Sequence, residues 1–97
     1  MNFQTWNLEL WNLELLMVPI TLPELGSPRP VLSLWYVAPG ERVYEGDRVA
    51  EVLIPGATFD VPAPTTGIVV ERLALPNDTL STGQVLGTID PDPDDLP

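Results

Sequence analysis

The sequence predicts an all-β domain, a sandwich or barrel of short strands, and three observations support this class. Twelve prolines and seven glycines among 97 residues, with 44% apolar residues, are typical of short strands joined by frequent turns. Apolar residues recur in short runs without sustained helical periodicity. Turn-forming clusters separate these runs at the spacing of a sandwich or barrel, not of βαβ units. A chain of this length forms one small domain at most.

Residues 1–16 are predicted to form an N-terminal apolar arm. They contain a duplicated pentapeptide, Trp-Asn-Leu-Glu-Leu, at residues 6–10 and 11–15. Each copy alternates apolar and polar residues, which favours a strand or a poorly ordered arm over a helix. Burial of each large side chain contributes about 1.5–3 kcal/mol, so we expect the arm to pack on the domain, to pair with a sheet edge or to bind another chain. We favour a homodimer formed through residues 1–16. The candidate contact residues of the arm are Trp6, Leu8, Leu10, Trp11, Leu13 and Leu15.

The body of the domain is predicted over residues 17–90. Clusters of Gly, Pro, Asn and Asp between the apolar runs supply the turns. Residues 91–97 form a predicted acidic disordered tail, because they are charged and have few apolar residues to bury. The six predicted strands cover residues 18–22, 31–37, 48–54, 58–61, 67–73 and 85–90.

The body also repeats internally at a shift of 37 residues. The shift places Gly46 on Gly83, and it matches apolar residues with apolar residues along both halves. Because neither half is large enough to close a core alone, the repeat predicts a quasi-two-fold body in which each half covers the other. The other matched pairs are Val31-Leu32 with Ile68-Val69, Pro39 with Pro76, Glu41 with Asp78, Val43 with Leu80, Val49 with Leu86, and Val52 with Ile89.

The composition argues against several functional classes. The chain has no Cys, His or Lys, which excludes disulfides, thiol nucleophiles, the usual zinc sites, the commonest general base and any lysine-linked prosthetic group. Its net charge of −10 repels phosphate backbones and anionic membranes, so we expect neither nucleic acid nor a membrane as partner. No apolar run reaches the ~20 residues of a membrane helix, and no targeting segment is recognised, so we expect a cytoplasmic protein.

The acidic residues do not predict a catalytic or metal site. Asp90, Asp92 and Asp94 alternate like the first ligands of a calcium loop, but the loop glycine and the distal glutamate are missing. Glu41 and Asp78 fall at equivalent positions of the repeat, which favours two turn residues over a catalytic pair. No catalytic and no metal-binding residue is therefore predicted, and we do not expect an enzyme.

The order of the motifs over residues 18–90 resembles the lipoyl/biotinyl attachment domain family, and most closely the acyltransferase components of 2-oxo-acid dehydrogenases. This resemblance implies a lipoyl-like flattened sandwich of two four-stranded sheets related by a quasi-two-fold. The motifs that carry it are Trp35-Tyr-Val37 with Gly40-Glu41 and Val43; Glu45-Gly-Asp47 with Val49, Glu51 and Val52; Ala57-Thr-Phe-Asp-Val61 with Ala63-Pro64 and Gly67-Ile-Val69; and Asp78, Leu80, Gly83-Gln84 and Leu86.

The sequence departs from this family where the prosthetic group is attached. The resemblance implies a lysine at a hairpin tip, eight residues before Pro64, and that position here is Gly56, preceded by Pro55. Pro presets φ near −65° and Gly accepts a positive φ, so the pair suits a type II turn. We therefore expect no cofactor. Together with Leu53 and Ile54, the turn could form an exposed contact surface instead.

Three functions remain open. We favour a non-catalytic, unmodified lipoyl/biotinyl-like module that acts as a protein–protein interaction or structural unit. The first alternative is an accessory component of a 2-oxo-acid dehydrogenase or biotin-dependent carboxylase assembly. The second is a membrane-fusion-type adaptor fragment, which ranks last because a long helical hairpin usually divides the two halves in that family.

Overall fold

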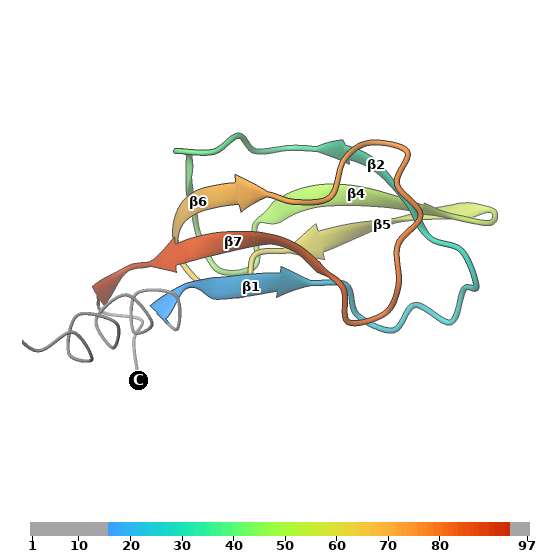
Figure 1. Ribbon diagram of the computed structural model, residues 1–97, viewed down its shortest axis with the longest axis horizontal. Helices are drawn as coiled ribbons and strands as arrows, with labels where there is room; N and C mark the ends of the chain where they lie inside the picture. Colours follow the sequence, from blue (N-terminus) through green and yellow to red (C-terminus); the bar gives the residue numbers. More distant parts are fainter. Residues whose placement is uncertain (1–15, 94–97) are drawn as a thin grey trace, which may run out of the picture.

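The computed structural model describes residues 16–93, which form two facing antiparallel sheets (Figure 1). The predicted all-β sandwich is thus confirmed. The four-stranded sheet has the order β1-β7-β6-β3, with β1 Val18–Thr21, β7 Val85–Pro91, β6 Gly67–Arg72 and β3 Arg42–Val43. The three-stranded sheet has the order β2-β4-β5, with β2 Val31–Trp35, β4 Arg48–Ile54 and β5 Ala57–Pro62.

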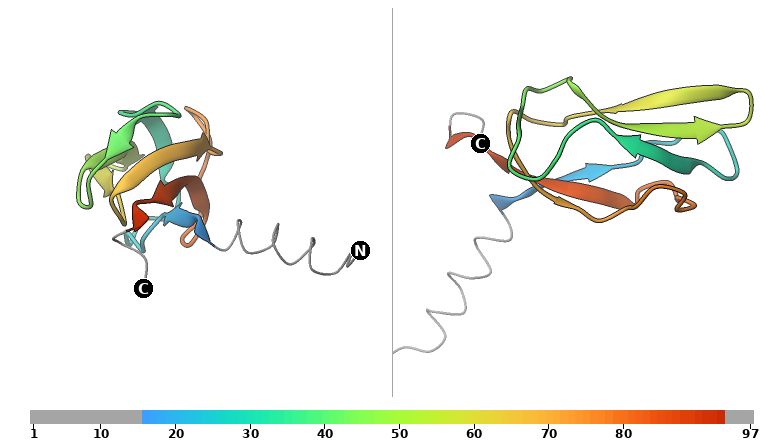
Figure 2. Two further views of the ribbon diagram at one scale, coloured as in Figure 1. Left: turned by 90° about the vertical axis from the view of Figure 1, so that its left-hand side faces the viewer. Right: turned by 90° about the horizontal axis from the view of Figure 1, so that it is seen from above.

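The core lies between the two sheets, which enclose a common interior when the molecule is seen from its end (Figure 2). The two central strands contribute their inward residues: Val49 and Val52 from β4, and Leu86 and Ile89 from β7, are fully buried. Trp35 and Phe59 are partly buried and pack against this cluster. The inward apolar residues of both sheets therefore form one common core.

The predicted repeat recurs in the backbone hydrogen bonds. The N–H of Leu32 donates to the carbonyl of Asp78 at 2.9 Å, and 37 residues away the N–H of Val69 donates to the carbonyl of Glu41 at 2.9 Å. Two turn glycines, Gly46 and Gly83, have positive φ angles of 91° and 83°. The two halves thus adopt the same backbone geometry, as the repeat predicted.

The three-stranded sheet corrects one expectation, because the resemblance implied four strands in each sheet. The position equivalent to β3 is reduced to a single bridge between Thr79 and Val31. Leu80 still donates its N–H to the carbonyl of Pro30 at 2.8 Å, but Pro30 has no N–H to return. Its equivalent in the other half is Gly67, which pairs with Val43. Pro30 therefore ends the ladder of backbone hydrogen bonds in one half, whereas Gly67 continues the equivalent ladder in the other half.

The strand boundaries otherwise follow the predictions with small shifts. β3 was not predicted, because two residues carry no readable alternation. β7 continues to a buried Pro91, and the N–H of Asp92 donates to the carbonyl of Thr66 at 2.9 Å. Pro91 and Asp92 are therefore held at the sheet, although the sequence placed them in the predicted acidic tail over residues 91–97. Residues 1–15, with all six candidate contact residues of the arm, and residues 94–97 lie outside the described residues. Within residues 16–93, no helix is long and apolar enough to span a membrane.

Candidate functional site

The tip of the β4–β5 hairpin is the position at which the resemblance implied an attachment lysine. The two strands pair in register as far as Ile54 and Ala57, which leaves Pro55 and Gly56 as a two-residue turn. Gly56 has the positive φ that the sequence predicted, at 77°. The tip projects beyond the other strands, at the end of the molecule opposite the start of β1 and the end of β7 (Figure 1).

The four predicted contact residues of the hairpin differ in exposure. Pro55 and Gly56 are exposed, and the side chain of Leu53 is 42% exposed. Ile54 is only half-buried, because it packs partly against the core. The hairpin tip therefore presents a small, mostly apolar surface.

The residues of this tip do not fit a lipoyl or biotinyl group. Such a group needs a primary amine at the tip, and the tip consists of a proline and a glycine. No lysine occurs among the 97 residues. Each arginine lies outside residues 54–57, and a guanidinium is not an acylation nucleophile at neutral pH. We therefore derive no chemical step through such a group.

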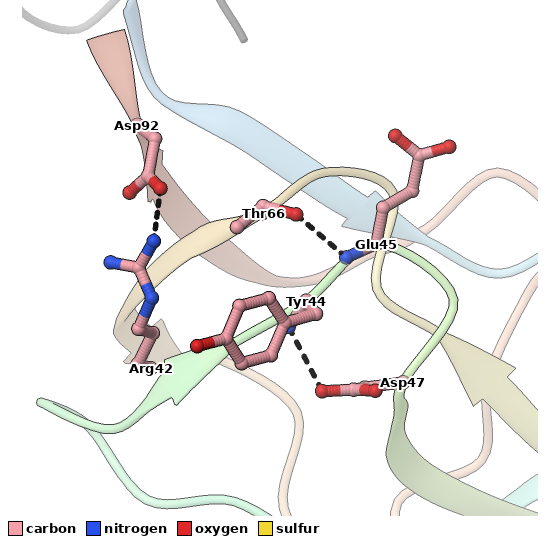
Figure 3. Close-up of polar contacts among 6 residues, drawn as sticks. All are labelled: Arg42, Tyr44, Glu45, Asp47, Thr66 and Asp92. Carbon is pink, nitrogen blue, oxygen red and sulfur yellow. Dashed lines mark hydrogen bonds and ion pairs between the residues drawn. The ribbon is translucent and has the colours of Figure 1, made fainter. Parts of the chain in front are cut away.

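A polar site lies at the opposite end, between β3 and the end of β7 (Figure 3). Arg42 forms an ion pair with Asp92, and this hydrogen bond raises the pKa of the arginine above its usual value. The pair fastens the segment that follows β7 to the edge strand β3.

The neighbouring contacts in the same site are turn interactions. The carboxylate of Asp47 accepts the N–H of Tyr44 at 2.9 Å, and the hydroxyl of Thr66 accepts the N–H of Glu45 at 2.9 Å (Figure 3). Each bond satisfies a backbone donor outside the strands. These residues hold the β3–β4 connection in place.

A second polar cluster lies on the outer face of the sheet β2-β4-β5. The hydroxyl of Tyr36 lies 3.0 Å from Asp60 and 3.3 Å from Glu51, and the guanidinium of Arg48 lies 4.7 Å from the centre of the Tyr36 ring. Arg48 also pairs with Asp60 at 3.6 Å. The sequence predicted no such cluster. The two-residue turn at Pro55 could have revealed it, since counting outward from that turn pairs Glu51 with Asp60.

A cavity of about 400 Å³ lies on the surface where the ends of β2 and β6 meet. The indole N–H of Trp35 donates to the carbonyl of Ala74 at 2.8 Å, so its ring is fixed. This cavity could not be predicted from the sequence, because its residues come from two distant segments. Its lining residues are Leu34, Trp35, Arg72, Leu75 and Pro76.

The two facing sheets, the repeat and the projecting hairpin define a lipoyl-domain-like fold. This fold resembles the solution structure of the lipoyl domain of the 2-oxoglutarate dehydrogenase complex from Azotobacter vinelandii, with a TM-score of 0.58 and 22% identity over 72% of this chain and 94% of that chain. The chain belongs to the family described as biotin-requiring enzyme, whose family model matches residues 18–89.

A curated relative points to one branch of this family. The chain is 33% identical over 73 residues to the lipoamide acyltransferase component of the branched-chain alpha-keto acid dehydrogenase complex of Bacillus subtilis (strain 168). The match covers 73% of this chain and 17% of that relative. The chain is therefore a lipoyl-domain-like module of the 2-oxo-acid dehydrogenase type.

Proposed function

We propose that this chain is an unmodified lipoyl-like module that binds another protein and neither carries a prosthetic group nor catalyses a reaction. The observation that carries this proposal is the Pro55-Gly56 turn at the tip of the β4–β5 hairpin. Since the turn is well formed, the hairpin keeps its shape without the residue that would accept the group. The exposed apolar surface beside the turn is available for a partner instead.

The intact mass of the chain tests whether it is modified. A gain-of-function variant tests whether Gly56 occupies the attachment position. The chain is expressed with a lipoate ligase or a biotin ligase, and we expect the mass of the unmodified sequence. The variant carrying Pro55→Asp and Gly56→Lys should gain one lipoyl group, whereas Pro55→Asp alone should not. The double change should cost about 1 kcal/mol, because it releases a preformed turn. An adduct on the unaltered chain would contradict the proposal, and a folded but unmodified double variant would contradict the assigned position.

A second copy of the chain, bound through residues 1–16, is the partner we propose. The large apolar side chains of that segment are costly to leave in water, and an open sheet edge can accept an added strand. We expect the full chain to sediment as a dimer at tens of micromolar. A variant with serine at Leu8, Leu10, Leu13 and Leu15 should sediment as a monomer. A monomeric full chain under these conditions would contradict self-association.

The second candidate function is an accessory part of a 2-oxo-acid dehydrogenase assembly. The 33% identity to a lipoamide acyltransferase component favours it. Affinity purification from the source organism distinguishes the two, since only an accessory component should retain dehydrogenase subunits at stoichiometric amounts.

A further inference from the structure

The outer face of the sheet β1-β7-β6-β3 carries exposed apolar residues beside Glu71 and Thr88, whereas the outer face of the other sheet carries the charged cluster around Tyr36. The 37-residue repeat places Leu73 at the position of Tyr36, and Val85 at the position of Arg48. Matching hydrogen bonds confirm this equivalence: the N–H of Tyr36 donates to Val49 at 2.9 Å, and the N–H of Leu73 donates to Leu86 at 2.8 Å. Leu73 is 51% exposed and Val85 is 39% exposed.

The edge strand β1 completes this apolar face. Pro19 is exposed and pairs with Thr88 on β7, as Asp60 pairs with Glu51 on β4. The fold itself does not require apolar residues at these places, because the equivalents of Val85 and Pro19 are the charged Arg48 and Asp60, and the equivalent of Leu73 is the polar Tyr36. A further function of the surface therefore explains them better. We call Pro19, Val85, Leu73 and the adjoining Leu75, which is 59% exposed, the apolar strip.

The apolar strip leads into the cavity at Arg72, which introduces a positive charge. Arg42 and Arg48 are paired with Asp92 and Asp60, but among the described residues Arg72 has no acidic partner within ion-pair distance. It donates only to the carbonyl of Val37, at 3.4 Å. An unpaired guanidinium beside exposed leucines suits an occupant with large apolar side chains and a carboxylate.

We propose that residues 6–15 cover the apolar strip and place the carboxylate of Glu9 or Glu14 at Arg72. The duplicated Trp-Asn-Leu-Glu-Leu has the required chemistry twice. This segment joins the described residues at Leu16, which is 45% exposed and lies two residues before β1, the strand that carries Pro19. Neighbouring strands lie about 4.8 Å apart, and ten extended residues span about 33 Å, so the segment is long enough to cross three strands and reach the cavity.

Paramagnetic broadening tests this occupancy in the full chain. The chain has no cysteine, so Asn12→Cys provides a single site for a nitroxide label. We expect the amides of Leu73 and Val85 and the indole N–H of Trp35 to lose most of their intensity, and the hairpin amide of Thr58 to keep its intensity.

Charge reversal tests the role of Arg72. Arg72→Glu should restore most of the lost intensity. Combining Arg72→Glu with Glu9→Arg and Glu14→Arg should bring the loss back. Arg29→Glu, which changes an exposed arginine outside the cavity, is the matched control and should have no effect.

Mixing labelled and isotope-enriched chains shows which copy provides the segment. The choice of copy rests on the proposed self-association, and the two proposals can fail separately. Broadening in mixed samples supports both occupancy of the strip and the homodimer. Broadening only when both labels are on one chain supports the occupancy and overturns the homodimer. Absence of broadening at the strip in both samples overturns the occupancy. The proposal that the module is unmodified is unaffected by this result, because intact mass tests it separately.

Discussion

The two halves of the repeat have the same turns built from different residues. In the first half, the carboxylate of Glu41 accepts the N–H of Ala38 at 3.0 Å. In the second half, the carboxylate of Asp78 accepts the N–H of Leu75 at 2.8 Å. The pattern continues one turn later, where Asp47 and Gln84 accept the N–H groups of Tyr44 and Ser81, each at 2.9 Å. A shared backbone therefore constrains the type of group at each turn and allows several residues to supply it.

The two halves differ on their outer faces. They also differ at the two positions whose side chains hydrogen-bond to the opposite half. Trp35 and Arg72 are equivalent, and both donate to equivalent carbonyls, those of Ala74 and Val37. The indole is partly buried against the core, whereas the guanidinium is exposed at the cavity. Positions that satisfy the fold in one half are thus available for another purpose in the other. This within-molecule comparison separates residues that the fold needs from residues that it merely tolerates.

The largest difference in stability between equivalent positions of the two halves is expected at Gly87 and its equivalent, Ala50. A Cβ at Gly87 would overlap the carbonyl oxygen of Glu71 and lie 3.1 Å from the ring of Trp35. Gly87→Ala should therefore lower the free energy of unfolding by about 3 kcal/mol, as overpacking of a core does. Ala50→Gly should lower it by only about 1 kcal/mol, the usual cost of glycine within a strand.

Urea denaturation followed by circular dichroism measures both changes. The predicted difference depends first on the carbonyl oxygen of Glu71 and then on the ring of Trp35, which both lie too close to accept a Cβ at Gly87. If Gly87→Ala destabilised the domain no more than Ala50→Gly, the two halves would be packed equally closely, and the proposed asymmetry would be wrong.

The same comparison shows what the sequence could predict. The Pro55-Gly56 turn, the alternation of β4 and the repeat of turn residues were readable because each depends on neighbouring residues. β3 was missed because a two-residue strand is held by its partner β6 rather than by its own pattern. The cavity was missed because Leu34 and Leu75 meet only after the halves pack together.

The turn carboxylates provide a smaller test. Glu41→Ala and Asp78→Ala each remove the acceptor of one backbone N–H, so each should lower the free energy of unfolding by about 1 kcal/mol, as the loss of a helix cap does. Asp78→Asn keeps an acceptor oxygen and should restore most of the stability. Thermal unfolding of the three variants measures these differences. Unequal losses at Glu41 and Asp78 would mean that the two turns are equivalent in shape but not in energy.

The smallest test compares Tyr36 with its apolar equivalent, Leu73. Partial desolvation raises the pKa of Tyr36 above 10.0, and its hydrogen bond to Asp60 and the charges of Asp60 and Glu51 raise it further. Because the folded state holds this proton more tightly than the unfolded state, the stabilisation is present below pH 10 and is lost as the pH rises through the raised pKa. Tyr36→Phe should therefore be less stable than the parent at pH 8 and should lose less stability between pH 9 and pH 11. Urea midpoints measured across this range decide the matter. If the stability of Tyr36→Phe fell with pH as steeply as that of the parent, the outer cluster of the sheet β2-β4-β5 would contribute no proton-linked stability. In that respect its charged face would behave like the outer face of the other sheet.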